Sequence, residues 1–330
     1  MSPDGSANGG LTGVDTDDWT RTELAPDAEW PFVVCLTHDV DRLSHRLPTL
    51  ARLREAPSAR RLRRLLGDTA PYWQFGTIRD VERDLGVRSS FYFLNEKSLF
   101  TDKRPNHWVR PQSWSLYSYY DIQRPAVRAV IETLADSAWE VGLQGSYESF
   151  DDRVRLAYEK SVLGEITGTR IRGGRQHYLN GRFPETWRHH RAIGLVYDTT
   201  LGSATEYGFD YGHDVIHPFG DDFAVFPLTV MDQALMESTD SVAAAKGAVD
   251  RLLTTARETG AVVTVDWHQR TFDDLDFPGY ADVYRYLVER ALELGAWVGP
   301  TGDAYELLVE GDAGRPVAGV TPAAVDDGVR

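Results

Sequence analysis

The sequence predicts one α/β domain built around a parallel sheet, either closed into a barrel or doubly wound. Between residues 30 and 310, short apolar runs alternate with segments whose apolar residues recur at helical spacing. The apolar runs are continuous and do not alternate with polar residues, which is typical of parallel strands covered on both faces. Hydrophobic residues make up 42% of the chain, which is enough for a core of full size.

The first predicted strand is residues 31–37 (PFVVCLT), and a similar apolar run at residues 261–267 (AVVTVDW) lies near the other end. Between them are runs at residues 89–94, 139–143, 194–197 and 223–228, and residues 296–298 are a weaker candidate. Cys35, the only cysteine, lies in the first run, so intramolecular disulfides and cysteine-based zinc sites are excluded. We expect Cys35 to be a small buried hydrophobic residue.

Three segments between the predicted strands have the apolar spacing of amphipathic helices. The first has Val127, Ile131 and Leu134 on one face, and the last has Tyr284, Leu287, Ala291 and Leu294, with Gly295 as a stop. In the middle helix the apolar residues are Leu156, Leu163 and Ile166. We expect residues 149–152 to cap its amino terminus and Gly168 to end it.

Both ends of the chain and one internal segment differ from this pattern. We expect residues 1–29 to be a flexible leader and residues 311–330 a flexible tail, around one domain spanning residues 30–310. Residues 42–66 contain eight arginines. They predict either a basic arm that binds phosphate or a membrane surface, or a solvated helix paired with acidic neighbours.

The net charge of −15 disfavours nonspecific binding to nucleic acid. Only four of the 35 basic residues are lysines, and an acidic, halophilic-type surface suits a salt-loving host, although a GC-rich genome also favours arginine. No apolar run approaches the roughly 18 residues of a membrane span. The amino-terminal segment lacks the features of a secretory signal, so we expect a cytoplasmic location.

Polar side chains that could carry chemistry follow several predicted strands. In parallel α/β folds, catalytic groups gather at the carboxyl ends of the strands. That rule selects His38, Asp39 and Asp41 after the first strand, and His268 after residues 261–267. It also selects residues 144–148, residues 175–178 and Asp198.

Each of these residues has a functional and a structural interpretation. Asp39 and Asp41 could divide the roles of base and ligand to a divalent metal such as zinc, or could cap the next turn. His268 could be a general acid near neutral pH or a hydrogen-bonded structural histidine. Arg175 could orient a carboxylate by a bidentate contact or form an ordinary surface ion pair.

Taken in order, these segments resemble the polysaccharide deacetylase (NodB-homology) family, in particular a subgroup with a Thr-His-Asp-Val-Asp first motif. Here that motif is residues 37–41. Arg175-Gln176-His177-Tyr178 resembles the family's Arg-x-Pro-Tyr segment, with His177 in place of proline, and Val265-Asp266-Trp267-His268 resembles its last segment. The resemblance implies a single distorted (β/α) barrel of about seven parallel strands, like those of glycoside hydrolases and deacetylases.

The resemblance also implies roles for the site residues. Asp39 would be the catalytic base and Asp41 a metal ligand, while Arg175 would orient the base. The backbone N–H of Tyr178 would donate to the oxyanion, and His268 would protonate the leaving amine.

The sequence departs from the family in the second segment, where His-x-x-x-His supplies two metal ligands. The matching positions here are Gln144 and Glu148. A metal held by Asp41, Glu148 and either His38 or Gln144 would have more oxygen ligands than the family's zinc site, which favours a harder ion. The alternative is that no metal binds and the hydrolase is inactive or altered.

The function that the resemblance implies is metal-dependent removal of N-acetyl groups from a carbohydrate or a glycan precursor. Two alternatives remain open. One is a catalytically lapsed relative that binds carbohydrate in glycan assembly, and the other is a hydrolase of another non-peptide C–N bond. Tyr147 and Trp187 could stack on sugar rings or pack in the core.

Overall fold

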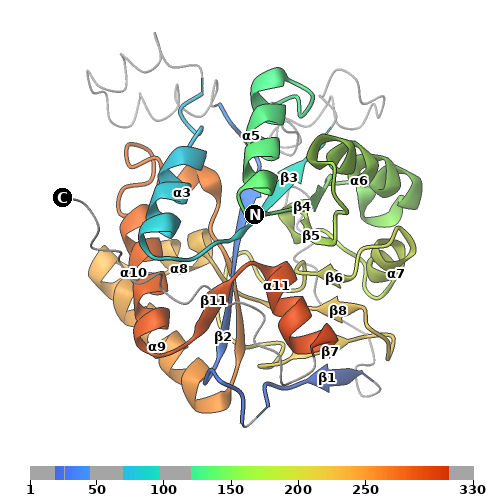
Figure 1. The fold of residues 1–330 in the computed structure, drawn as a ribbon. Helices are drawn as coiled ribbons and strands as arrows, with labels where there is room; N and C mark the ends of the chain where they lie inside the picture. The colour runs from blue at the N-terminus through green and yellow to red at the C-terminus, as the bar shows by residue number, and fades with distance from the viewer. Residues whose placement is uncertain (1–18, 26, 45–69, 97–119, 312–330) are drawn as a thin grey trace, which may run out of the picture.

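The computed structural model describes residues 19–25, 27–44, 70–96 and 120–311, in which one sheet is surrounded by helices (Figure 1). Its strands are β1 (Thr20–Thr22), β2 (Val33–Val40), β3 (Ser90–Leu94), β4 (Glu140–Gly145), β5 (Gly173–Gln176), β6 (Tyr197–Asp198), β7 (Val215–His217), β8 (Ala224–Val225), β9 (Leu228–Met231), β10 (Val262–Asp266) and β11 (Trp297–Gly299). The helices are α3 (Phe75–Asp84), α5 (Pro125–Asp136), α6 (Arg153–Thr167), α7 (Glu185–Ala192), α8 (Asp232–Glu237), α9 (Val242–Thr259), α10 (Tyr280–Glu293) and α11 (Thr301–Tyr305). Shorter helical turns are η2 (Ser149–Asp151), η3 (His177–Leu179), η4 (Gln269–Phe272) and η5 (Glu306–Glu310).

The strands form one curled sheet in the order β1-β7-β8-β6-β5-β4-β3-β2-β10-β9, and β11 also pairs with β2. All pairs are parallel except those of β7 with β1 and with β8. Helices follow most of the parallel strands and cover the outside of the curl (Figure 1). The expected distorted (β/α) barrel is confirmed, although within the described residues the curl is open between β1 and β9.

Strand β2 is the strand from which the candidate site is built. It pairs with β10 along residues 33–37, with β11 along residues 33–35 and with β3 along residues 37–40. The strand therefore continues to Val40, beyond the predicted run of residues 31–37, because pairing with β3 extends it through polar residues. Asp39 consequently lies within the strand, opposite Tyr92, and not in a turn that follows it.

The side chains of β2 alternate between two cores. Val34 and Leu36 pack in the core between the sheet and its helices. Val33 and Cys35 pack in the core inside the curl, and Cys35 is fully buried, as expected. Since side chains alternate along a strand, Asp39 also faces the inside of the curl.

The three predicted helices are present, and the two for which a glycine stop was predicted end within two residues of that glycine. Helix α6 is capped by Asp152, whose side chain accepts from the Arg155 N–H, and it ends at Gly168 in the left-handed conformation (φ 66°). Helix α5 buries its predicted apolar face, and α10 is followed by Gly295 with φ 86°. In the part of the chain that the structure describes, no helix combines the length and apolar character that crossing a bilayer requires.

The outer segments differ from the predictions in part. Residues Thr20–Thr22 pair with β7, so this part of the predicted leader 1–29 belongs to the sheet. The predicted run 223–228 is divided between β8 and β9, with Pro227, which has no N–H to donate, lying between them. Residues 45–66 of the arginine-rich segment and residues 312–330 of the predicted tail lie outside the described residues.

Candidate active site

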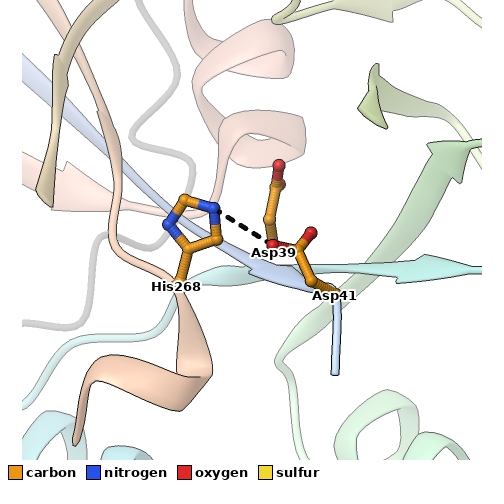
Figure 2. A group of neighbouring side chains, drawn as sticks. All are labelled: Asp39, Asp41 and His268. Atoms are coloured by element: carbon orange, nitrogen blue, oxygen red, sulfur yellow. Dashed lines mark ion pairs between the residues drawn. The ribbon is translucent and has the colours of Figure 1, made fainter. Parts of the chain in front are cut away.

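Charged and polar side chains meet inside the curl at the carboxyl ends of the parallel strands. Asp39 and Gln144 lie on β2 and β4, and Arg175 lies on β5. Asp41 directly follows β2, and His268 lies two residues beyond the end of β10. All five are buried, with exposed fractions of 8% or less. Figure 2 shows the carboxylates of Asp39 and Asp41 beside the ring of His268.

Both carboxylate oxygens of Asp39 accept hydrogen bonds. Oδ1 accepts from Nη1 of Arg175 at 2.8 Å, and Oδ2 accepts from Nε2 of Gln144 at 3.2 Å. The backbone N–H of Asp39 donates to Asp266 Oδ1 at 3.3 Å. Burial and the carboxylate of Asp266 raise the pKa of Asp39 to about 7, although Arg175 opposes the shift. A carboxylate with this pKa suits a general base near neutral pH.

Arg175 joins two carboxylates through one nitrogen. Its Nη1 lies 2.8 Å from Asp39 Oδ1 and 3.2 Å from Asp266 Oδ1, and its Nε donates to the Thr199 carbonyl at 3.1 Å. The side chain is fully buried, so the interpretation as a surface ion pair is wrong. Arg175 therefore holds Asp39 in place, although the contact is not the expected two-nitrogen fork.

Asp41 is surrounded by nitrogen atoms. Oδ2 is ion-paired with Nη1 of Arg270, and Oδ1 accepts from Nε2 of Gln144 at 2.8 Å. The Nε2 atoms of His177 and His268 each lie 3.5 Å from one of the carboxylate oxygens. Burial opposes the charge of Asp41, but Arg270 and the two histidines outweigh it and hold its pKa well below the usual range. Asp41 is therefore a stable anion.

His268 is positioned by Asp232, which follows β9 directly. The Nδ1 atom of His268 lies 2.9 Å from Asp232 Oδ1, and its backbone N–H donates to Asp232 Oδ2 at 2.9 Å. This contact leaves Nε2 facing Asp41 (Figure 2). Burial and Arg270 disfavour a charge on the ring, but Asp232, Asp266 and Asp41 outweigh them and raise the pKa of His268 to about 9. The ring is therefore a proton donor near neutral pH.

The structure does not bring His38 to this site. Its side chain leaves β2 on the face opposite to Asp39, because successive side chains of a strand alternate. Nδ1 lies 2.5 Å from the Trp267 carbonyl oxygen, and Nε2 lies 2.9 Å from Oε1 of Glu82. His38 is therefore not placed to bind a metal together with Asp41.

Three other predicted residues lie on the segments that follow β4 and β5. Tyr178 has a left-handed backbone conformation (φ 60°), and the residue is 39% exposed. Its ring meets the half-buried ring of Tyr147 edge to face, with 6.0 Å between the centroids. Glu148 is half-buried and precedes η2. The two tyrosines form the aromatic surface next to His177 and the site.

Trp187 and Asp198 are buried and hydrogen-bonded to each other, and their role is structural. Trp187 is fully buried, stacks on Phe183 with 4.3 Å between centroids, and donates from Nε1 to Asp198 Oδ1 at 2.9 Å. The expectation that Trp187 stacks on sugar rings is therefore wrong, because no face of its ring is accessible to a ligand.

Sequence reasoning missed Asp232 and Arg270 and gave no role to Asp266. Asp232 directly follows a strand, so the strand-end rule would have selected it if the predicted run 223–228 had been extended to residue 231. Arg270 lies two residues beyond His268, and no feature of the sequence distinguishes it from the other arginines.

By position alone, three of these residues form a buried group that could hold a metal ion. One oxygen each from Asp39 and Asp41 and one ring nitrogen of His268 lie within 4.8 Å of one another. Among the residues that the structure describes, Glu148 and His38 are not part of such a group.

The hydrogen bonds around that group do not fit a divalent cation. Asp41 is already paired with Arg270, and Gln144 directs its NH₂, not its oxygen, toward both carboxylates. The residues present would have to exchange these partners before a metal could bind.

No family model matches the sequence, and no curated protein matches it. Solved structures do match. A candidate polysaccharide deacetylase from Mycobacterium smegmatis is 15% identical with a TM-score of 0.55, covering 87% of this chain and 93% of that chain. A candidate polysaccharide deacetylase from Pseudomonas aeruginosa PAO1 is 12% identical with a TM-score of 0.55, covering 84% and 92%. The Puue allantoinase is 16% identical with a TM-score of 0.53, covering 86% and 92%. At these identities the likeness establishes the fold.

Proposed function

We propose that this protein is a hydrolase that removes N-acetyl groups from a carbohydrate or a glycan precursor. The observation that carries the proposal is a base and an acid on one buried wall, each held by its own partner. Asp39 is held by Arg175, and His268 is held by Asp232. The similar folds of the two candidate deacetylases support this class of reaction.

The two side chains would divide the proton transfers of amide hydrolysis. Asp39 takes a proton from a water molecule as the water oxygen bonds to the acyl carbon. His268 gives its ring proton to the nitrogen as the C–N bond breaks, so that acetate and a free amine are released. Each positioned acid or base of this kind contributes roughly 10²–10⁴-fold to the rate.

Acetate release from N-acetylated monosaccharides, nucleotide sugars and oligosaccharides tests this proposal. We expect Asp39→Asn and His268→Gln each to lower kcat by roughly 10²-fold or more, with little change in KM. Asp240→Asn changes an exposed carboxylate and is the matched control. If folded wild-type protein releases no acetate from any of these substrates, the deacetylase function is rejected.

A lapsed relative that binds carbohydrate is the second candidate. The ion pair of Asp41 with Arg270 favours it, because a carboxylate held in this way is not free to bind the cation that deacetylases of this fold are expected to use. Saccharide binding in calorimetry without acetate release from the same saccharide would identify this function.

Hydrolysis of a cyclic amide or ureide is a third candidate. It is favoured by the similar fold of the Puue allantoinase. The same base and acid could open a ring by cleaving its C–N bond. Loss of the cyclic substrate without acetate release, measured by chromatography, would distinguish this reaction from deacetylation.

A further inference from the structure

We propose that Arg270 takes the place of a divalent cation in this site, where it neutralises Asp41 and donates a hydrogen bond to the acyl oxygen of the substrate. The first half of the proposal concerns metal binding and is independent of any activity. The second half rests on the hydrolase function proposed above and names the group that would stabilise the developing charge.

The contacts of Asp41 support the claim that Arg270 takes the place of a cation. Nη1 of Arg270 is paired with Oδ2, and Nε2 of Gln144 donates to Oδ1 at 2.8 Å. Ring nitrogens of His177 and His268 lie 3.5 Å from Oδ1 and Oδ2. A carboxylate offers about four lone-pair positions, and four nitrogen atoms surround this one. A cation would have to displace at least one of them, and Arg270 would repel it.

The amide of Gln144 bridges the two carboxylates of the site. Its Nε2 lies between the two carboxylates, 3.2 Å from Asp39 Oδ2 and 2.8 Å from Asp41 Oδ1. Its Oε1 is buried and has no hydrogen-bond partner among the described residues. If the amide turned over, Oε1 would face the anionic carboxylate of Asp41 at the distance now held by Nε2, and a cation between the two oxygens would relieve that repulsion. The orientation of Gln144 therefore matches a site without a metal.

Arg270 is also placed to reach a substrate. It lies on η4, two residues beyond His268, and its side chain is 13% exposed, whereas that of Arg175 is fully buried. Apart from the pair with Asp41, its guanidinium makes a contact of 3.4 Å from Nη2 to Oε1 of Gln233. Because a guanidinium has five N–H donors, it can hold Asp41 and still donate to a substrate oxygen.

This arrangement supplies the charge that amide hydrolysis requires. As the water oxygen bonds to the acyl carbon, the carbonyl electrons move to the acyl oxygen, which becomes negative. An N–H of Arg270 stabilises that charge until the C–N bond breaks and the carbonyl bond forms again. Water and the amide are the only reactants, so no further co-reactant is needed.

Metal binding tests the first half without a substrate. Full-length wild type, Arg270→Gln, Gln144→His and the double variant are incubated with zinc chloride and dialysed, and zinc per chain is measured by mass spectrometry. We expect no retained zinc in the wild type and one zinc per chain in the double variant, which gains an imidazole and loses the competing cation. Only the double variant should show a higher unfolding temperature with zinc than without it.

Two further variants separate charge from other effects. Both are combined with Gln144→His, the change that the zinc-binding double variant also carries. Arg270→Lys in this background keeps the positive charge and should stay free of zinc, whereas Arg270→Gln should bind it. Arg285→Gln in the same background removes an arginine of α10 that is 40% exposed, and it should leave the protein free of zinc. One zinc per chain in the dialysed wild type, or equal zinc affinity in the wild type and the double variant, would overturn the proposal.

The acetate assay tests the second half. We expect Arg270→Gln to lower kcat by roughly 10²–10³-fold, Arg270→Lys to lower it less, and a chelator to leave the wild-type rate unchanged. An unchanged kcat in Arg270→Gln would refute the contact with the acyl oxygen. Loss of activity with a chelator and recovery with zinc would refute both halves. If neither the wild type nor any variant releases acetate, the contact of Arg270 with the acyl oxygen fails together with the proposed function. The zinc measurements still decide whether Arg270 takes the place of a cation.

Discussion

The Nδ1 atom of His38 lies 2.5 Å from the carbonyl oxygen of Trp267, and this contact ties together the two strands that carry the acid and the base. His38 precedes Asp39 on β2, and Trp267 precedes His268. The Nε2 atom of His38 lies 2.9 Å from Oε1 of Glu82, which also accepts a hydrogen bond from the Tyr284 hydroxyl at 2.6 Å. A buried polar network therefore fixes the spacing of the site from the outer side of the sheet.

Replacing His38 by phenylalanine should destabilise the fold. The change removes two buried hydrogen bonds, those of the ring with Glu82 and with the Trp267 carbonyl, and a loss of about 2–4 kcal/mol in the free energy of unfolding is expected. Urea unfolding followed by fluorescence measures the loss. His189→Phe, at a half-buried position on α7, is the matched control. Equal stability of His38→Phe and wild type would contradict the role of the network.

Trp187→Phe should lower stability without changing saccharide binding. The phenylalanine ring keeps the stack on Phe183 but cannot donate to Asp198, so about 1–3 kcal/mol should be lost. Tyr147→Ala removes a half-buried ring next to the exposed Tyr178, and it should weaken saccharide binding instead. Calorimetric titration and urea unfolding of both variants measure the two effects. Weaker saccharide binding in Trp187→Phe, with unchanged binding in Tyr147→Ala, would show that Trp187 contacts the ligand.

Gly174→Ala should prevent correct packing of β5 against β4. A Cβ at this position would lie 1.8 Å from the carbonyl oxygen of Leu143, and a backbone atom in a paired strand cannot move away. We expect a loss of more than about 3 kcal/mol in the free energy of unfolding, or insoluble protein.

Gly76→Ala is the matched control. At Gly76, in the first turn of α3, nothing lies within 4 Å of an added Cβ. Gly76→Ala should therefore stabilise by about 0.5–1 kcal/mol. Comparable unfolding midpoints for the two variants would contradict the register of β4 and β5.

The rate of hydrolysis should pass through a maximum between neutral and mildly alkaline pH. Asp39 must be ionised, and burial with the Asp266 carboxylate raises its pKa to about 7, so kcat/KM should rise as pH rises through 7. His268 must be protonated, and despite its burial and Arg270 the carboxylates, led by Asp232, raise its pKa to about 9, so kcat/KM should fall above 9.

Asp232→Asn tests the alkaline side of this profile. Without that carboxylate the pKa of His268 should fall, so the decrease in kcat/KM should begin at a lower pH than in the wild type. Asp240→Asn, at an exposed position, should leave the profile unchanged. An alkaline limb that does not move in Asp232→Asn would show that another group donates the proton.

The sequence by itself determined the fold class, most of the parallel strands and the residues at their carboxyl ends. These follow from local pattern: continuous apolar runs form strands, helical spacing forms the covering helices, and alternation along β2 places Asp39 inside the curl. Asp39, Arg175 and His268 were selected in this way, and the structure brings them to one buried wall.

Only the tertiary structure decided which partner each charged side chain has. Arg270 and Asp41 are separated by 229 positions and His268 and Asp232 by 36, and with 35 basic and 50 acidic residues the sequence allows many other pairings. The pairing depends on distance and burial, because charges interact strongly only where they are close together and away from water. For the same reason the sequence left open whether Asp41 binds a metal, and the contact with Arg270, which no local pattern encodes, is what favours a guanidinium in that position.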